Sequence, residues 1–261
     1  MKILKVCVFL LSLVVVKLSW AEITIMPLGD SITAGEETGA LPPEETNGYR
    51  KELVNHLGTS GYNVNFVGSL ENGSFLDNQH EGHSGWRDDQ IADYVYEFLN
   101  DHPTDIVLLH IGTNDLNTNP SDVEDILDEI DRWETDNNKT VLVILAKIIN
   151  RKGHVCPAPS TTTTFNSNVE AMALSRSDDR LVLVDMECSA GLNYLSDMAE
   201  LLHPNSTGYA KMADSWFTDG LLYILPMADA GGDQNVDEKT LVTLNGSGSG
   251  DPDGSSLDYW W

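Results

Sequence analysis

The chain alternates between short apolar segments and longer segments with helical periodicity, and this alternation restricts its fold more than any other feature. Five apolar segments fall at residues 23–28, 64–67, 106–111, 141–145 and 181–184. Each has the length of a strand, and the third is almost continuously apolar, as expected of a strand buried on both faces. Strands that alternate with helices form parallel sheets, because each connection crosses back over the sheet. The sequence therefore predicts an α/β fold: a three-layer α/β/α sandwich with a five-stranded parallel sheet.

The segments between these strands carry apolar residues three and four positions apart, which is the spacing of one helix face. The faces expected to be buried are Tyr49/Leu53/Leu57, Ile91/Tyr94/Val95/Phe98/Leu99, Ile126/Leu127/Ile130/Trp133, Phe165/Val169/Met172 and, over residues 207–222, Tyr209/Met212/Trp216/Phe217. Residues 69–87 lack this spacing and predict a long polar loop.

The first 21 residues have the pattern of a secretory signal peptide. Lys2 and Lys5 precede an apolar run over residues 6–16, and small residues up to Ala21 form a cleavage site. The run is shorter than the ~20 apolar residues that a membrane-spanning helix needs. We therefore expect cleavage after Ala21 and a secreted protein, extracellular or periplasmic, although Lys17 leaves an uncleaved anchor open.

The formal net charge is −26. The predicted signal peptide holds three lysines and no acid, so the mature chain would keep 12 basic against 41 acidic residues, a net charge of −29. Such a field repels nucleic acid, anionic lipid and anionic polysaccharide. We expect neutral substrates, and neither a nucleic-acid partner nor a membrane after signal cleavage.

Two cysteines remain after Cys7 leaves with the signal peptide. Cys156 and Cys188 follow the fourth and fifth predicted strands, so both lie at the same edge of the sheet. An even number of cysteines in an oxidising compartment favours a disulfide between them, and two buried free thiols are the alternative.

The chain changes in composition after Pro226. We assign residues 22–226 to the α/β domain and residues 227–261 to a linker and a truncated β module of immunoglobulin type. The tail is rich in Gly, Ser and Asp, and Asp251-Pro252-Asp253-Gly254 is a turn signal between alternating apolar residues. A flexible linker is the alternative, with further modules, such as carbohydrate-binding ones, beyond Trp261.

Polar residues converge where the predicted strands end. Ser31 follows the first strand, Gly68 the second and Asn114 the third, while Glu200 and His203 come between the fifth strand and the last helix. These positions share the carboxyl edge of a parallel sheet. With the strand order 2-1-3-4-5, the first and third strands flank the crevice where sites form.

These residue types suit nucleophilic catalysis. Ser31 becomes a nucleophile when a base takes its proton, and His203 can do this at neutral pH. The resulting oxyanion needs fixed donors, which the backbone N–H groups of Ser31 and Gly68 and the side-chain amide of Asn114 can supply. A serine after a strand is more often a helix cap, so the convergence and not the serine alone predicts the chemistry.

The same residues resemble the four blocks of the SGNH (GDSL) hydrolases. The blocks are Gly29-Asp30-Ser31, Gly68 after Phe66-Val67, Gly112-Thr113-Asn114-Asp115 and His203-Pro204-Asn205, in the order the family uses. The resemblance implies a flavodoxin-like α/β fold, Ser31 as nucleophile, His203 as base, and Ser31, Gly68 and Asn114 as the oxyanion hole. We expect no cofactor and no metal.

Two further segments resemble finer groupings. Residues 80–86, His-Glu-Gly-His-Ser-Gly-Trp, are similar to a segment of family 3 carbohydrate esterases. That likeness implies an acetylxylan esterase, which removes acetyl groups from polysaccharides such as xylan. Trp86 and His83 are candidate substrate contacts, or residues that simply order the loop. The tail, with Ala230-Gly231 and Asp251-Pro252-Asp253-Gly254, resembles the start of a PKD-type module.

The third member of the catalytic group departs from the family pattern. The family has Asp three residues before the histidine, whereas this chain has Glu200 there and Asp197 three residues earlier. We favour Glu200, with Asp197 or a Ser–His dyad as alternatives.

Two other functions remain open from the sequence. The same four blocks also serve an arylesterase, lipase or thioesterase that acts on other acyl groups. A protein of another class, a carbohydrate-binding or adhesion protein with an inactive hydrolase frame, would not need Ser31, Asn114 and His203 intact.

Overall fold

The computed structural model describes residues 22–38, 42–115, 117–176 and 179–225, and in the tail residues 231–232, 234, 236–237 and 240–250. The predicted signal peptide and Pro226 lie outside the described residues. No helix in the described ranges combines the length and the apolar character that a membrane crossing requires.

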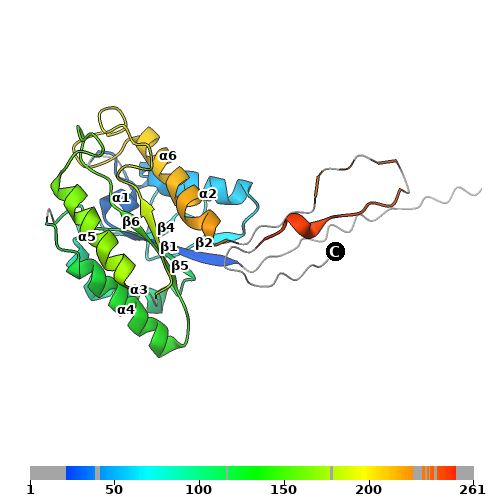
Figure 1. Cartoon of the computed structure of the whole chain (residues 1–261), viewed down its shortest axis with the longest axis horizontal. Coiled ribbons are helices and arrows are strands. Elements are labelled where there is room, and N and C mark those ends of the chain that lie inside the picture. The colour runs from blue at the N-terminus through cyan, green and yellow to red at the C-terminus, as the bar shows by residue number, and fades with distance from the viewer. Residues whose placement is uncertain are drawn as a thin grey trace, which may run out of the picture.

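The five predicted strands form one parallel sheet at the centre of the domain (Figure 1). They are β1 (Ile23–Gly29), β2 (Val64–Phe66), β5 (Ile106–His110), β6 (Leu142–Lys147) and β7 (Leu181–Asp185). The order across the sheet is β2-β1-β5-β6-β7, and every pair is parallel. This is the predicted order 2-1-3-4-5, and the α/β prediction is confirmed.

The predicted polar loop contains two further strands, β3 (Leu70–Glu71) and β4 (Gln79–Gly82). β4 runs parallel to the carboxyl end of β1, with Leu28 opposite Glu81, while β3 pairs antiparallel with β4. The sheet therefore has more than the five strands expected. The sequence of β4 is polar but buried, because hydrogen bonds satisfy His80 and Glu81, and such a strand has no apolar alternation to reveal it.

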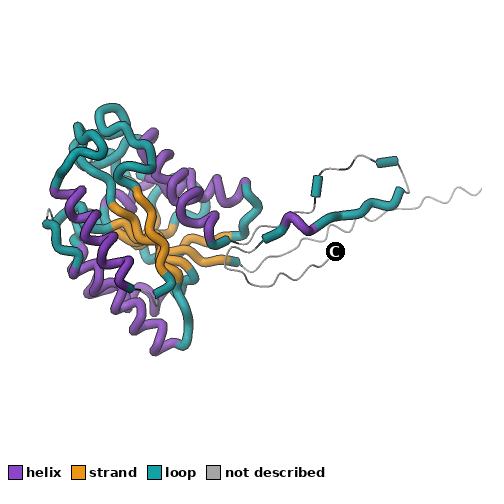
Figure 2. Tube along the Cα trace, viewed as in Figure 1, coloured by secondary structure: helices purple, strands orange, loops and turns teal. Residues whose placement is uncertain are grey.

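Helices cover both faces of the sheet (Figure 2). They are α1 (Ser31–Ala34), α2 (Gly48–Thr59), α3 (Asp88–Asp101), α4 (Ser121–Asn137), α5 (Thr161–Ser175) and α6 (Ser206–Ser215). α2 and α6 pack on the face that holds Ile106 and Leu108, and α3, α4 and α5 pack on the face that holds Val107 and Leu109. Consecutive residues of β5 thus enter opposite halves of the core, which is why this strand is apolar nearly throughout.

The last helix differs in type from the prediction. It is α-helical only to Ser215, continues as a π-helical turn over Trp216–Gly220, and ends in a 3-10 turn over Leu221–Tyr223. Gly220 lies against the sheet, where an added Cβ would meet Ile144 at 3.0 Å. The helix therefore packs closely on the sheet at this turn.

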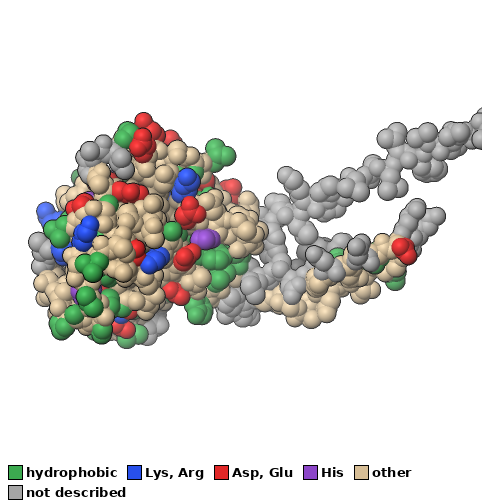
Figure 3. Space-filling view, turned by 90° about the horizontal axis from the view of Figure 1, so that it is seen from above, with side chains coloured by type: hydrophobic (Ala, Val, Ile, Leu, Met, Phe, Trp, Pro, Cys, Tyr) green, Lys and Arg blue, Asp and Glu red, His purple; other side chains and the backbone are tan. Residues whose placement is uncertain are grey.

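The described residues of the tail extend away from the domain in Figure 1. Its described residues contain one 3-10 turn, Gly246–Gly248, and no strand. The β module and the domain boundary thus stay predictions. Over the face shown in Figure 3, acidic and basic side chains are interspersed, so the negative charge forms no single patch there.

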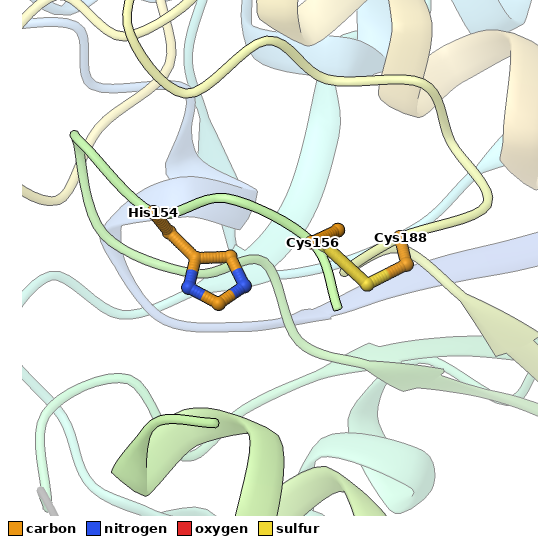
Figure 4. Close-up of side chains that lie close together, drawn as sticks. All are labelled: His154, Cys156 and Cys188. Atoms are coloured by element: carbon orange, nitrogen blue, oxygen red, sulfur yellow. A yellow bond between two sulfur atoms is a disulfide. The ribbon is translucent and has the colours of Figure 1, made fainter. Parts of the chain in front are cut away.

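The predicted disulfide is present. Cys156 and Cys188 are bonded, with their Cα atoms 5.6 Å apart, in the loops that follow β6 and β7. His154 lies on the same loop as Cys156, beside the disulfide (Figure 4), and its Nε2 is 3.5 Å from Oε1 of the buried Glu187. With both sulfur atoms bonded to each other, this group offers no thiolate to a metal.

Candidate active site

Ser31 is the first residue of α1, immediately after β1 ends. The side chain of Asp30 caps this short helix, since its Oδ1 accepts a hydrogen bond from the Ile32 N–H at 2.9 Å. Gly29 permits the turn, because a Cβ there would lie 2.1 Å from the His110 carbonyl oxygen on the neighbouring strand. The strand and helix therefore present the serine at the carboxyl edge of the sheet.

Ser31 and His203 contact each other although 172 positions separate them. Ser31 Oγ lies 2.8 Å from His203 Nε2. His203 belongs to the loop before α6, whose N-terminus is capped by the Asn205 side chain accepting from the Gly208 N–H at 3.1 Å. A bridge between Met198 and Pro204 closes this loop.

Glu200 contacts the other nitrogen of the same imidazole. Its Oε1 lies 2.6 Å from His203 Nδ1, but the contact is too poorly aligned to count as a good hydrogen bond. The same oxygen accepts from the backbone N–H groups of His203 at 2.7 Å and Leu202 at 3.0 Å. Partial burial acts to raise the pKa of Glu200, but these two amides and the imidazole outweigh it and hold the pKa below its ordinary value.

Asp197, the alternative third member, makes other contacts. Its Oδ2 pairs with Lys211 Nζ at 2.7 Å and accepts from the Asn193 N–H at 2.7 Å. Burial acts to raise the pKa of Asp197, but Lys211 and these hydrogen bonds leave it lowered. Of the two carboxylates, only Glu200 contacts His203.

The expected oxyanion donors are Ser31, the first residue of α1, and two loop residues, Gly68 after β2 and Asn114 after β5. Gly68 packs against the backbone of His80, where an added Cβ would be 2.3 Å from the carbonyl oxygen, so a side chain cannot fit. The backbone N–H groups of Ser31 and Gly68 have no acceptor among the described residues. Asn114 Nδ2 donates one hydrogen bond to the Trp86 carbonyl oxygen at 2.8 Å, which leaves its second N–H for another acceptor.

Residues 28–211 match the family model of the GDSL-like lipases and acylhydrolases. The chain belongs to this family. The match runs from the end of β1 into α6 and includes every residue of the candidate site, and the family's chemistry is the cleavage of esters.

Three relatives illustrate what this GDSL domain is similar to. The family 3 carbohydrate esterase of Clostridium thermocellum is 29% identical, with a TM-score of 0.63, over 77% of this chain and 96% of that one. A family 3 carbohydrate esterase from Talaromyces cellulolyticus is 26% identical, with a TM-score of 0.59, over 74% and 93%. A multidomain esterase of Ruminococcus flavefaciens is 27% identical over 74% of this chain, which spans only 28% of that protein.

Sequence reasoning missed Glu81, which braces the loop after Gly68 in this GDSL domain. Glu81 is fully buried on β4. Its carboxylate accepts from the Ser69 N–H at 2.5 Å and from the Ser69 hydroxyl at 2.9 Å, and it contacts His83 Nε2 at 2.8 Å. One buried carboxylate therefore ties β4 to the segment next to the Gly68 N–H. One hint of this role was present in the sequence: Glu81 lies within residues 80–86, the segment that contains the candidate substrate contacts.

His83 and Trp86, the candidate substrate contacts, pack together. The His83 ring stacks on Trp86 at 4.2 Å between centroids and on Phe98 of α3 at 4.9 Å. Tyr94 lies 5.4 Å from Trp86 and is exposed, whereas it was expected on the buried face of its helix. His83 is thus held between two rings, while Trp86 and Tyr94 reach the surface.

Arg50 is the second residue that sequence reasoning missed. It is fully buried on α2, next to Tyr49 in the apolar stripe. Its guanidinium donates hydrogen bonds to five carbonyl oxygens, those of Thr33, Ala34, Thr46, Asn72 and Asn78. Burial lowers the pKa of Arg50 to about 10. The side chain thus joins the end of α1, behind Ser31, to the loop between β3 and β4.

His80 and His110 are structural. His80 Nδ1 accepts from the Gly82 N–H at 2.9 Å and Nε2 contacts Asn72 Oδ1 at 3.1 Å, while burial lowers the pKa of His80 to about 2. His110 Nε2 accepts from the Ile149 N–H at 3.3 Å, and burial lowers its pKa to about 4. Both rings stay neutral at physiological pH.

Proposed function

We propose that this protein is a secreted serine esterase that removes acetyl groups from a polysaccharide such as xylan, through a covalent acyl-serine intermediate. The observation that carries the proposal is the line of contacts from Ser31 Oγ to His203 Nε2 at 2.8 Å and from His203 Nδ1 to Glu200 at 2.6 Å. A serine, an imidazole and a carboxylate in this arrangement are the parts that nucleophilic catalysis of acyl transfer needs.

The reaction would follow from these contacts. His203 Nε2 takes the proton of Ser31 as Oγ attacks the ester carbonyl, and Glu200 stabilises the imidazolium that forms. The oxyanion is held by the Ser31 and Gly68 backbone N–H groups and by the second N–H of Asn114. His203 then gives its proton to the leaving alcohol. Water, activated by the same histidine, attacks the acyl-serine and releases the acid.

The choice of substrate rests on likeness and charge. Two solved relatives, 29% and 26% identical to this chain, are both named family 3 carbohydrate esterases. The net charge of −26 disfavours anionic substrates, whereas an acetylated neutral polysaccharide carries no charge to repel. Trp86 and Tyr94 offer aromatic surface on which a sugar ring can stack.

Secretion and modularity belong to the same proposal. The basic and apolar pattern of residues 1–21 supports export, and the Cys156–Cys188 disulfide suits an oxidising compartment. The tail after the hydrolase domain would join it to further modules, and a PKD-type module is the one we propose.

Acetate release from acetylated xylan, measured beside hydrolysis of p-nitrophenyl acetate and p-nitrophenyl octanoate, tests the substrate. We expect acetate release and a kcat/KM for the acetyl ester at least ~10-fold above that for the octanoyl ester. Faster cleavage of the octanoyl ester would favour the lipase or thioesterase alternative. No hydrolysis of any ester by folded protein would favour the carbohydrate-binding alternative.

A further inference from the structure

Glu36 places a second carboxylate close to the imidazole of His203, beside the ring nitrogen that Glu200 does not contact. Its Oε2 lies 4.0 Å from Nε2, the nitrogen that contacts Ser31, whereas Glu200 contacts Nδ1. The side chain of Glu36 is 28% exposed and that of His203 is 14% exposed, so solvent reaches both groups. No step of the reaction proposed above uses Glu36.

The backbone of Glu36 is tied to the elements that carry both members of the Ser31–His203 pair. Gly35 ends α1 in the left-handed conformation, and the Glu36 N–H donates to the Ser31 carbonyl oxygen at 3.0 Å. The Glu36 carbonyl oxygen accepts from the hydroxyl of Tyr209, a buried residue of α6, the helix that follows His203. The position of Glu36 is therefore set by the same elements that present the nucleophile and the base.

Ser84 holds the side chain of Glu36 by one of its two oxygens. From the loop after β4, two residues before Trp86, Ser84 Oγ donates to Glu36 Oε1. Among the described residues, no donor bonds to Oε2 and no lysine or arginine forms an ion pair with Glu36. The carboxylate therefore keeps one acceptor oxygen beside His203 Nε2.

We propose that Glu36 Oε2 and His203 Nε2 together hold the water that hydrolyses the acyl-serine. The inference rests on the acyl-serine mechanism of the proposed function. Two acceptors that share one water, each about 2.8 Å from its oxygen atom, lie about 4–4.5 Å apart, and Oε2 and Nε2 are separated by 4.0 Å. A separation of this size between two polar groups suits a bridging water better than a direct hydrogen bond. One O–H of the water points to Nε2 and the other to Oε2.

The hydrolytic step needs no reactant besides this water. The water oxygen bonds to the acyl carbon while His203 Nε2 takes one of its protons. His203 then returns that proton to Ser31 Oγ as the bond between Oγ and the acyl carbon breaks, and the carboxylic acid leaves with the second hydrogen of the water. Glu36 takes up no net proton, and its contribution is to orient the water so that a lone pair faces the acyl carbon.

This arrangement distinguishes water from an alcohol as the nucleophile. Water has two O–H groups, one for Nε2 and one for Glu36 Oε2. An alcohol gives its only hydroxyl proton to His203 and has none left to donate to Glu36. Glu36 should therefore favour hydrolysis of the acyl-serine over transfer of the acyl group to an alcohol, including its return to the sugar that has just left.

Partitioning of the acetyl-enzyme between water and methanol tests the proposal in the full chain. p-Nitrophenyl acetate supplies the acetyl group, release of p-nitrophenol measures total turnover, and methyl acetate is quantified by gas chromatography. Glu36→Met removes the acceptor and should slow hydrolysis about tenfold but methanolysis less than about twofold, so that the ratio of methyl acetate to acetate rises at least ~5-fold. Glu37→Met is the matched control, because the neighbouring, half-buried Glu37 loses the same charge, and it should keep the wild-type ratio.

The product ratio separates a role in holding water from general damage to the site, because a distorted site slows both nucleophiles alike. Glu36→Gln, whose amide oxygen can still accept a hydrogen bond, should give a ratio between those of the wild type and Glu36→Met. An unchanged ratio in Glu36→Met, or an equal rise in Glu37→Met, would overturn the role of Glu36 and leave the proposed function intact. Failure of the folded wild type to release p-nitrophenol would overturn both.

Discussion

Two of the carboxyl groups near the Ser31–His203 pair, those of Asp30 and Glu200, are built in opposite ways. Asp30, on the serine side, is fully buried, and burial raises its pKa to about 6 against the opposing effects of the Ile32 amide, Thr113 and His203. Glu200, on the histidine side, is 40% exposed, and backbone amides with the imidazole keep its pKa low. The serine is thus held by buried structure, while the histidine is oriented by an ionised group in a partly exposed loop.

This difference shows that the serine side of the site is held more firmly than the histidine side. Behind Ser31 stand the Asp30 cap and the five hydrogen bonds of Arg50, of which those to Thr33, Ala34 and Thr46 are buried. Apart from Ser31 and Glu36, whose Oε2 lies 4.0 Å from Nε2, the contacts of His203 are local to its own loop, where Glu200 accepts from the His203 and Leu202 N–H groups. Changes on the serine side should therefore affect stability, and changes on the histidine side should affect turnover.

Arg50→Met tests the serine side with the largest expected effect. The variant removes the donors of five carbonyl oxygens in the core and should lower the free energy of unfolding by about 3–5 kcal/mol. Urea denaturation followed by circular dichroism measures it. Arg180→Met, at an exposed position, is the control and should change stability by no more than about 0.5 kcal/mol. Equal midpoints for the two variants would contradict the bracing role of Arg50.

Asn114→Ala tests the side-chain donor to the oxyanion, which belongs to neither the serine side nor the histidine side of the site. We expect kcat to fall on the order of 10²–10³-fold with little change in KM, because this donor acts mainly in the transition state. Steady-state kinetics with p-nitrophenyl acetate give both constants. A change confined to KM would mean that Asn114 binds the substrate in its ground state.

Glu200→Gln tests the histidine side of the site. The amide keeps the acceptor for the His203 and Leu202 N–H groups but loses the charge that stabilises the imidazolium. We expect kcat to fall about 10–10²-fold, less than the ~10⁴-fold loss for the buried, well-aligned carboxylate of serine proteases, because Glu200 is exposed and poorly aligned.

Asp197→Asn is the matched control for Glu200, and it should leave kcat nearly unchanged. It breaks the pair with Lys211, which lies away from His203. If Asp197→Asn lowered kcat and Glu200→Gln did not, the assignment of Glu200 as the third catalytic residue would be wrong.

The catalytic residues could be predicted from the sequence, whereas the buried residues that brace the serine side could not. Ser31, His203 and Glu200 could be placed together because strand ends and family blocks are local patterns that share one edge of a parallel sheet. Arg50, Glu81 and strand β4 could not, because their burial depends on hydrogen bonds to segments distant in sequence. Nothing in the sequence marks an arginine or glutamate as buried, since most arginines and glutamates in proteins are exposed.

Asp30→Asn sharpens the comparison through pH. The raised pKa means that the folded state binds a proton more tightly than the unfolded chain, so ionised Asp30 destabilises the fold above about pH 6. As pH falls from 7 to 4, the wild type should gain roughly 1–3 kcal/mol of stability relative to the variant. The asparagine retains the helix cap. A stability difference independent of pH, measured by urea denaturation, would contradict the assignment.

Covalent labelling of Ser31 tests the central claim most directly. The purified protein is treated with a p-nitrophenyl dialkyl phosphate, and release of p-nitrophenol and the modified peptide are followed by absorbance and mass spectrometry. The account predicts one equivalent of p-nitrophenol, a single phosphorylated residue at Ser31, and no reaction in folded Ser31→Ala. Labelling at another residue, or unchanged ester hydrolysis by Ser31→Ala, would contradict it.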